Sequence, residues 1–174
     1  MPMRPLPKEL IKYHGICDLD GLFRMIAAWL KDRGYEVEEK KVKSKVPSPA
    51  GGEQEIEWSA WLRETDYLKN WIHLHYWLYE MKDVDVVKDG VKRKLTRIRL
   101  QIEIATEVET DWQKRWESST FLKHLRDFYE RHIIRKDLET IWEDKLYYIV
   151  LKLHAAIKEY LDMENKANPY HDVW

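Results

Sequence analysis

Hydrophobic and polar residues alternate through the middle of the chain, and this period of two predicts β-strands. The alternation is clearest in residues 53–64 and 67–79, and it returns in residues 98–104. Residues 35–46 carry few apolar positions among many charges, which is typical of a strand at the edge of a sheet. The Asp-Gly pair at residues 89–90 predicts a tight hairpin turn between the last two strands.

Apolar residues at helical spacing flank this region on both sides. The first helix is expected within residues 18–34, after a capping aspartate and before a glycine that ends it. A second helix begins near residues 119–120, and a third runs over residues 137–164. Residues 1–17 and 165–174 show neither period, so both termini are expected to be irregular.

The expected elements follow one another in the order α-β-β-β-β-α-α. A chain of 174 residues with this pattern is most simply one α+β domain spanning residues 1–174. The simplest packing is a four-stranded antiparallel meander with the N-terminal helix and the two C-terminal helices on one face. The alternative is a curled sheet around the long C-terminal helix, with a cavity enclosed between them.

The register between the two clearest strands follows from the short connection between them. A tight connection around Thr65 places Trp61 opposite Trp71 and Glu57 opposite His75. Inward-facing residues of one strand then lie beside inward-facing residues of the other. This agreement supports the register, because a slip of one residue would turn every side chain to the wrong face.

A tight turn at residues 89–90 would pair residues that point to opposite faces of the sheet. With a tight turn there, the outward-facing Tyr79 would lie opposite the inward-facing Leu100. One extra residue in the first strand of the hairpin restores the match between faces. We therefore expect a β-bulge within residues 80–86.

One face of the predicted sheet is rich in aromatic rings. The opposite face carries the isoleucine and leucine side chains that the apolar helix stripes need as a partner, so the aromatic face points away from the core. Tryptophan and tyrosine at such places often anchor contacts with other molecules. The candidate interaction or ligand-binding surface consists of Trp61, Trp71, His73, His75, Trp77 and Tyr79, with Arg97 and Arg99 on the neighbouring strand.

The two histidines of this face raise the question of a metal site. His73 and His75 project to the same side of one strand, and Glu57 faces His75, so three ligands could meet there. Glu103 is expected opposite His75 or Trp77, among the same groups. A histidine beside a carboxylate on a strand is more often a hydrogen-bonded surface group than a metal ligand. We therefore expect no metal and no other cofactor, and keep these three residues as the weaker alternative.

Composition and charge narrow the classes of function. The net charge of −1 argues against a protein whose main activity is non-specific binding of nucleic acid. The basic run at residues 92–99, beside Trp77 and Tyr79, keeps single-stranded nucleic acid as an alternative partner. The single cysteine, Cys17, excludes an internal disulfide framework. The sequence has no secretory segment and no apolar run of membrane-spanning length, so we expect a cytoplasmic protein without membrane contact.

Four stretches within residues 18–160 read DLDGLFRMIAAWL, DYLKNW, EMKDVDVVKDG and RWESSTFLKHLRDFYERHIIR. In these stretches the chain resembles an uncharacterised family of small archaeal hypothetical proteins. The stretches match in pattern and contain no catalytic signature. The resemblance implies a fold type and an archaeal source, and it assigns a role to no residue.

The motifs of common catalytic sites are missing from the sequence, which has no glycine-rich phosphate loop, CxxC, HExxH or GxSxG. We therefore expect a non-enzymatic module that uses its aromatic face for contact with another protein, most simply a second copy of itself. The alternative is a domain that binds a small apolar ligand between a curled sheet and the long helix.

Overall fold

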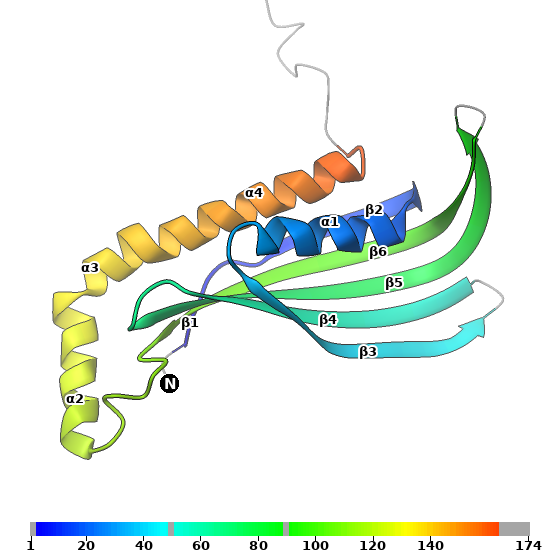
Figure 1. Ribbon diagram of the computed structural model, residues 1–174. Coiled ribbons are helices and arrows are strands. Elements are labelled where there is room, and N and C mark those ends of the chain that lie inside the picture. Colours follow the sequence, from blue (N-terminus) through cyan, green and yellow to red (C-terminus); the bar gives the residue numbers. More distant parts are fainter. Residues whose placement is uncertain (1–2, 49–50, 89–90, 164–174) are drawn as a thin grey trace, which may run out of the picture.

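The computed structural model describes residues 3–48, 51–88 and 91–163, and it has an α+β architecture (Figure 1). Helices α1 and α4 lie across one face of an antiparallel sheet. Within the described residues the sheet has six strands in the order β1-β6-β5-β4-β3, and β2 also pairs with β6. The strands are β1 (Met3–Pro5), β2 (Glu9–Cys17), β3 (Glu36–Ser48), β4 (Gly51–Arg63), β5 (Leu68–Lys88) and β6 (Val91–Thr110).

The predicted meander is present as β3 to β6, and β3 is an edge strand as expected. The prediction of an irregular segment over residues 1–17 is wrong, because β1 and β2 extend the sheet along β6 and raise its described strands from four to six. The period of β2 is hidden in the sequence because its apolar residues lie on both faces. Ile11 is buried, whereas Leu10 and Ile16 are 45% and 47% exposed.

The described strands do not close around α4, since β3 forms one edge of the sheet and β1 with β2 forms the other. The sheet is therefore open, whereas the alternative expected a curled sheet around the long helix with a cavity enclosed between them. The face that α1 and α4 cover is filled by side chains, and the other face is reached by no described helix (Figure 1).

Two helices supply the apolar layer over the sheet. Helix α1 (Leu19–Lys31) begins as predicted at Asp18, whose carboxylate accepts a hydrogen bond of 2.9 Å from the backbone N–H of Gly21. Helix α4 is Asp144–Tyr160. Each presents one buried stripe to the sheet: Leu22, Ile26 and Leu30 in α1, and Leu146, Val150, Leu153 and Ile157 in α4. None of the described helices is both long and apolar enough to cross a membrane.

Helix α2 (Thr120–Phe128) begins as predicted at Ser119, whose hydroxyl accepts a hydrogen bond of 3.1 Å from the N–H of Leu122. Its position differs from the prediction, because α2 lies beyond the end of the sheet and at a steep angle to α4 (Figure 1). None of its residues is buried, so of the two C-terminal helices only α4 covers the sheet. The two are joined by the π-helical turns η1 (Tyr129–Ile133) and η2 (Leu138–Glu143), with α3 (Arg135–Asp137) between them.

The predicted register of the central strands is confirmed. Trp61 pairs with Trp71 and Glu57 pairs with His75 between β4 and β5. On the other side of β5, His75 pairs with Glu103 of β6, which was one of the two expected positions. Five strand positions therefore line up across the sheet from β3 to β2 at this level, and His75 is the central one.

The predicted β-bulge is also confirmed, because the pairing of β5 with β6 shifts between Tyr79 and Lys82. Glu80 within the bulge has a φ of 57°, in the left-handed region. The bulge lies against the start of β4, where a Cβ on Gly51 would come within 2.6 Å of the carbonyl carbon of Glu80. Only glycine leaves room for that approach. The predicted turn at residues 89–90 lies outside the described residues.

The core lies between the inner face of the sheet and the helices α1 and α4. The inward-facing residues of β5, which are Ile72, Leu74, Tyr76 and Leu78, are all buried, so the predicted assignment of faces is confirmed. An aromatic cluster joins three elements: the ring of Tyr76 lies 5.1 Å from that of Phe23 in α1 and 5.4 Å from that of Trp58 in β4.

Candidate functional site on the outer face of the sheet

The sheet face that the described helices leave open carries the residues that the sequence singles out. Alternation along β5 places Trp71, His73, His75, Trp77 and Tyr79 on it. Trp61 joins them from β4, and Arg97 and Arg99 lie on β6. The structure therefore brings the predicted site residues together on one surface, which we call the outer face.

The aromatic side chains of the outer face are half-buried rather than fully exposed. Trp71 stacks on His73 with ring centroids 5.8 Å apart, and His75 stacks on Trp77 at 3.7 Å. Trp61 lies 5.7 Å from Trp71 across the strands. These contacts run along and across β5, so each ring shelters part of its neighbour and keeps one side open to an incoming group.

Polar partners hold the central rings in place. The indole N–H of Trp71 donates a hydrogen bond of 2.7 Å to Glu109. Nδ1 of His73 lies 3.0 Å from the hydroxyl of Ser59, and burial lowers the pKa of His73 below its usual range. The outer face is thus organised before any partner arrives.

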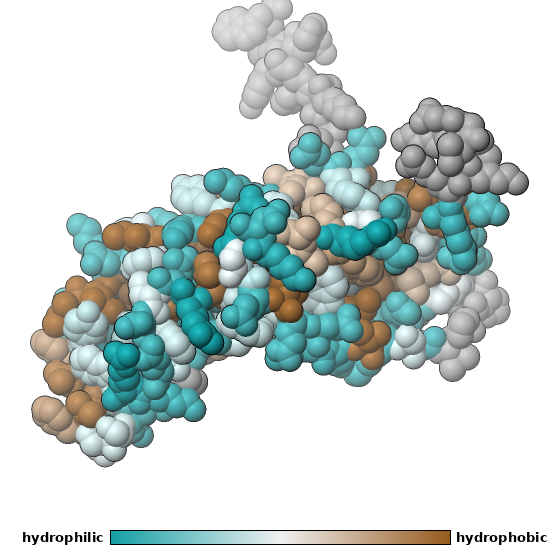
Figure 2. All heavy atoms as spheres, in the orientation of Figure 1, coloured by the Kyte–Doolittle hydropathy of each residue, from teal (hydrophilic) through white to brown (hydrophobic). Residues whose placement is uncertain are grey.

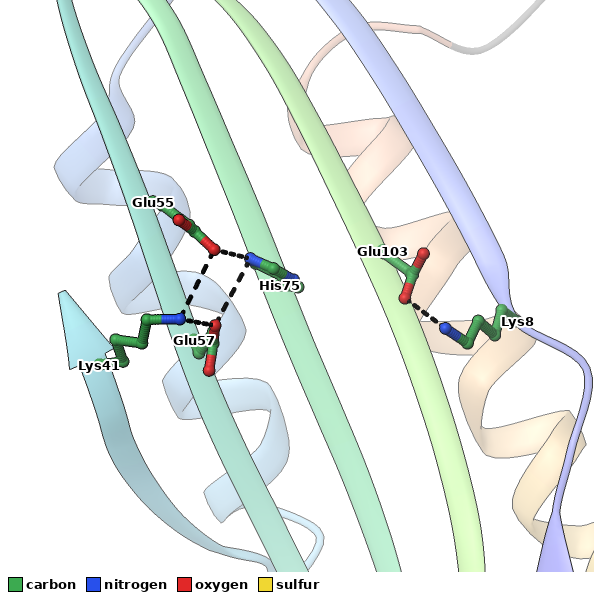
Figure 3. Close-up of polar contacts among 6 residues, drawn as sticks. All are labelled: Lys8, Lys41, Glu55, Glu57, His75 and Glu103. Atoms are coloured by element: carbon green, nitrogen blue, oxygen red, sulfur yellow. Dashed lines mark hydrogen bonds and ion pairs between the residues drawn. The ribbon is translucent and has the colours of Figure 1, made fainter. Parts of the chain in front are cut away.

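A cluster of two carboxylates and one imidazole forms where β3, β4 and β5 meet (Figure 3). One ligand atom each from Glu55, Glu57 and His75 lie within 4.8 Å of one another. Of the three residues predicted as possible metal ligands, His75 and Glu57 are in this cluster. His73 is not in it, because it contacts Ser59 and Glu107 instead. The sequence prediction missed Glu55, which lies one pleat from Glu57 on the same strand face.

A lysine already supplies positive charge to this cluster. Nζ of Lys41 lies 2.6 Å from Glu57 and 3.7 Å from Glu55, so a metal ion would have to displace it (Figure 3). The hydrogen bond of 2.9 Å from His75 to Glu55 lowers the pKa of that carboxyl. Glu103 lies opposite His75 in the sheet, yet its carboxylate pairs with Lys8 at 2.8 Å. The geometry is that of an ion-paired network.

The two arginines lie at the bulge end of the outer face. The guanidinium of Arg99 lies 4.7 Å from the ring centroid of Tyr79, and its Nε donates a hydrogen bond of 3.1 Å to Glu80. Arg97 is exposed and pairs with Lys82 in the strand register. Because Glu80 neutralises Arg99, this end of the face is weaker as a site for nucleic-acid phosphates than the basic run at residues 92–99 suggests.

Cys17 lies in the core of the fold. Its side chain is buried, and burial raises the pKa of its thiol to about 11. A thiolate is the reactive form, so at neutral pH the residue behaves as a small apolar core group.

Several exposed hydrophobic side chains lie away from the outer face, on α2 and η1. Phe121, Leu125 and Phe128 of α2 are 73%, 40% and 55% exposed, and Ile133 of η1 is 60% exposed. Figure 2 shows hydrophobic residues gathered at this end of the molecule. Their spacing marks one stripe of an amphipathic helix, which the sequence had placed against the sheet.

Comparison with protein-family models and with curated proteins finds no match to the chain. The resemblance to small archaeal proteins stays a prediction.

We expect the stability of the fold to decrease as the pH falls below 6.5, in part through His73. Burial lowers the pKa of His73 in the folded chain, so the unfolded chain takes up the proton first. The stabilisation is therefore present above pH 6.5 and is lost as the pH falls toward the folded pKa. His154, whose pKa burial also lowers, acts in the same direction.

Urea unfolding at about pH 7.5 and about pH 5.5 measures this loss. His73→Gln and His154→Gln should each reduce the difference between the two midpoints, and the double change should reduce it most. A His73→Gln variant with the full wild-type difference would contradict the assignment.

Proposed function

We propose that the protein is a non-enzymatic binding module whose outer face contacts another protein chain, most simply a second copy of itself. The observation that carries the proposal is the set of partly exposed rings, Trp61, Trp71, Trp77 and Tyr79, on a sheet face that no described helix covers. Tryptophan and tyrosine dominate the energetics of protein interfaces because they bury a large area at a small cost in conformational entropy.

The electrostatics of the outer face favour docking over chemistry. The carboxylates beside the rings are paired within the chain, with Lys41 on Glu57 and Lys8 on Glu103. Paired charges let another surface approach without strong like-charge repulsion. A catalytic carboxylate or histidine would instead need an open approach to a reacting atom, and His75 is stacked under Trp77 and bonded to Glu55.

The test is the oligomeric mass of a variant with two rings removed from the outer face. Wild-type protein is expected to be a dimer by light scattering or sedimentation. Trp71→Ser with Trp77→Ser should be a monomer with nearly unchanged circular dichroism, because both side chains point away from the core. A matched double change on the other exposed apolar surface, Phe121→Ser with Phe128→Ser, should remain a dimer.

Three results would contradict the proposal. A wild type that stays monomeric at high concentration would exclude self-association through any surface. If the Phe121/Phe128 variant is a monomer and the Trp71/Trp77 variant is still a dimer, the interface lies on α2 and not on the outer face. Unfolding of the Trp71/Trp77 variant would mean that these rings belong to the structural core.

A further inference from the structure

A second aromatic site lies at the other end of the fold, where the loop after β6, η1, α3 and η2 meet the start of β5. It is a pocket of about 270 Å³ open to the surface. Its walls come from the turn before β5, the loop after β6 and the two π-helical turns. The lining residues are Thr65, Tyr67, Leu68, Trp116, Tyr129, Ile134, Asp137, Leu138 and Trp142. The pocket shares no residue with the outer face and does not depend on the proposed function.

The walls of this pocket are mostly aromatic. Trp116 and Tyr129 are stacked with ring centroids 5.6 Å apart, and Tyr67 meets Tyr129 edge to face at 6.0 Å. Trp142 adds a fourth ring from η2. The face of an aromatic ring carries negative charge density, so several rings around one small space favour a positively charged occupant.

The charged groups at the pocket also favour a positively charged occupant. Asp137 is the charged residue among its described lining, which includes no lysine or arginine. A second carboxylate, that of Glu130, accepts a hydrogen bond of 2.6 Å from the hydroxyl of Tyr67, which lines the pocket. Burial and that carboxylate raise the pKa of Tyr67, so its ring stays neutral. The pocket is therefore complementary to one positive charge.

Two cations near the pocket already have partners. Lys145 pairs with Glu64 at 2.9 Å, and its ammonium lies 5.6 Å from the ring centroid of Trp142. Arg126 pairs with Asp127 at 3.1 Å. Neither residue lines the pocket, so a small cation from solution would not have to displace either of them.

The walls are held in position by the backbone. Both carboxylate oxygens of the buried Asp111 accept hydrogen bonds, at 2.9 Å from the N–H of Arg115 and at 3.1 Å from that of Trp116. The hydroxyl of Thr65 accepts hydrogen bonds from the N–H groups of Tyr67 and Leu68. A pocket that is formed before its ligand arrives loses less entropy on binding. π-helical turns such as η1 and η2 are frequent at functional sites.

We propose that this pocket binds a small organic cation, of the class of quaternary or methylated ammonium groups, between its aromatic walls and the carboxylate of Asp137. Such a group presents methyl surfaces to the rings and spreads its charge over them, which a hydrated ammonium does less well. A volume of about 270 Å³ suits a head group of this size and is small for a larger ligand.

Calorimetric titration with two probes tests the proposal. Choline carries the quaternary ammonium, and 3,3-dimethylbutan-1-ol has the same shape without the charge. Choline should bind about tenfold more tightly than the alcohol, or better, because only the cation gains from the rings and the carboxylate. The intrinsic tryptophan fluorescence, to which Trp116 and Trp142 contribute, should change on titration with choline.

Two substitutions locate the binding in the pocket. Asp137→Asn should weaken choline binding by about tenfold and leave binding of the alcohol unchanged, since Asp137 is exposed and its loss does not disturb the core. Asp20→Asn on α1, which removes one carboxylate far from the pocket, should change neither. Trp116→Leu should abolish choline binding in a variant whose circular dichroism is that of wild type.

The proposal is overturned by equal affinities for the two probes, which would make the pocket a site for neutral apolar groups. It is also overturned if choline fails to bind at about 10 mM, well above ordinary small-ligand affinities. Choline binding that Asp137→Asn leaves unchanged would place the cation elsewhere on the protein and would equally contradict the proposal.

Discussion

Tyr76→Ala should lower the free energy of unfolding by about 3–5 kcal/mol, the range for emptying a large buried aromatic site. Tyr76 is fully buried at the centre of β5 and contacts the rings of Phe23 and Trp58. Removing its ring leaves a cavity between the sheet and α1 that strand backbones cannot close. Urea denaturation followed by circular dichroism measures the loss.

The matched variant Tyr76→Phe should behave in the opposite way. The hydroxyl of Tyr76 is buried with no hydrogen-bond partner among the described residues, and a buried polar group without a partner costs stability. Its removal should leave stability unchanged or raise it by about 1 kcal/mol. A loss of about 1 kcal/mol or more in Tyr76→Phe would instead mean that a buried water satisfies the hydroxyl.

Asp111→Ala should cost about 2–4 kcal/mol, because it removes a charged carboxylate that accepts two hydrogen bonds from backbone N–H groups. Asp111 is 2% exposed and holds the loop that follows β6 through the N–H groups of Arg115 and Trp116. The same change should weaken choline binding, since Trp116 is a wall of the aromatic pocket. Urea denaturation and calorimetric titration measure the two effects.

A second substitution at the same position separates the hydrogen bonds from the backbone conformation. Asp111 has a φ of 50°, in the left-handed region, where alanine is strained and glycine is not. Asp111→Gly should therefore cost about 1 kcal/mol less than Asp111→Ala. Equal stability of wild type and Asp111→Ala would contradict the anchoring role of the carboxylate.

Strict alternation made the central sheet predictable. In β4 and β5 the inward-facing residues are almost all apolar, so only one register places inward-facing residues beside each other. Between β5 and β6 a tight turn would have placed the outward-facing Tyr79 opposite an inward-facing residue, and this mismatch predicted the bulge that the structure contains. β2 could not be predicted, because its residues do not alternate between apolar and polar in this way. It carries Leu10 and Ile16 on its exposed face, and its place is set by pairing with β6, which is distant in sequence.

The two aromatic sites also differ in how far the sequence predicts them. The outer face could be predicted because most of its rings follow one another along β5, at every second residue. The pocket could not be predicted from the sequence. Its four rings, Tyr67, Trp116, Tyr129 and Trp142, come from separate segments of the chain that meet only in the folded structure, beyond the end of the sheet. Its only signal in the sequence is the abundance of tryptophan and tyrosine, nine and ten residues, which names no location.

The pairing of β1 and β2 with β6 constrains the order in which the chain can fold. These two strands lie near the start of the sequence, but their only described sheet partner is the last strand of the sheet. On the ribosome they must wait unpaired while the hairpins of β3 to β6 assemble, and Ile11 and Cys17 stay exposed until β6 has emerged. Such distant pairing slows folding, because the entropy cost of closing a long loop comes before the stabilising contacts that offset it. Until residues 91–110 have been synthesised, β1 and β2 therefore present unpaired strand edges and apolar side chains, the kind of surface through which incompletely folded chains aggregate.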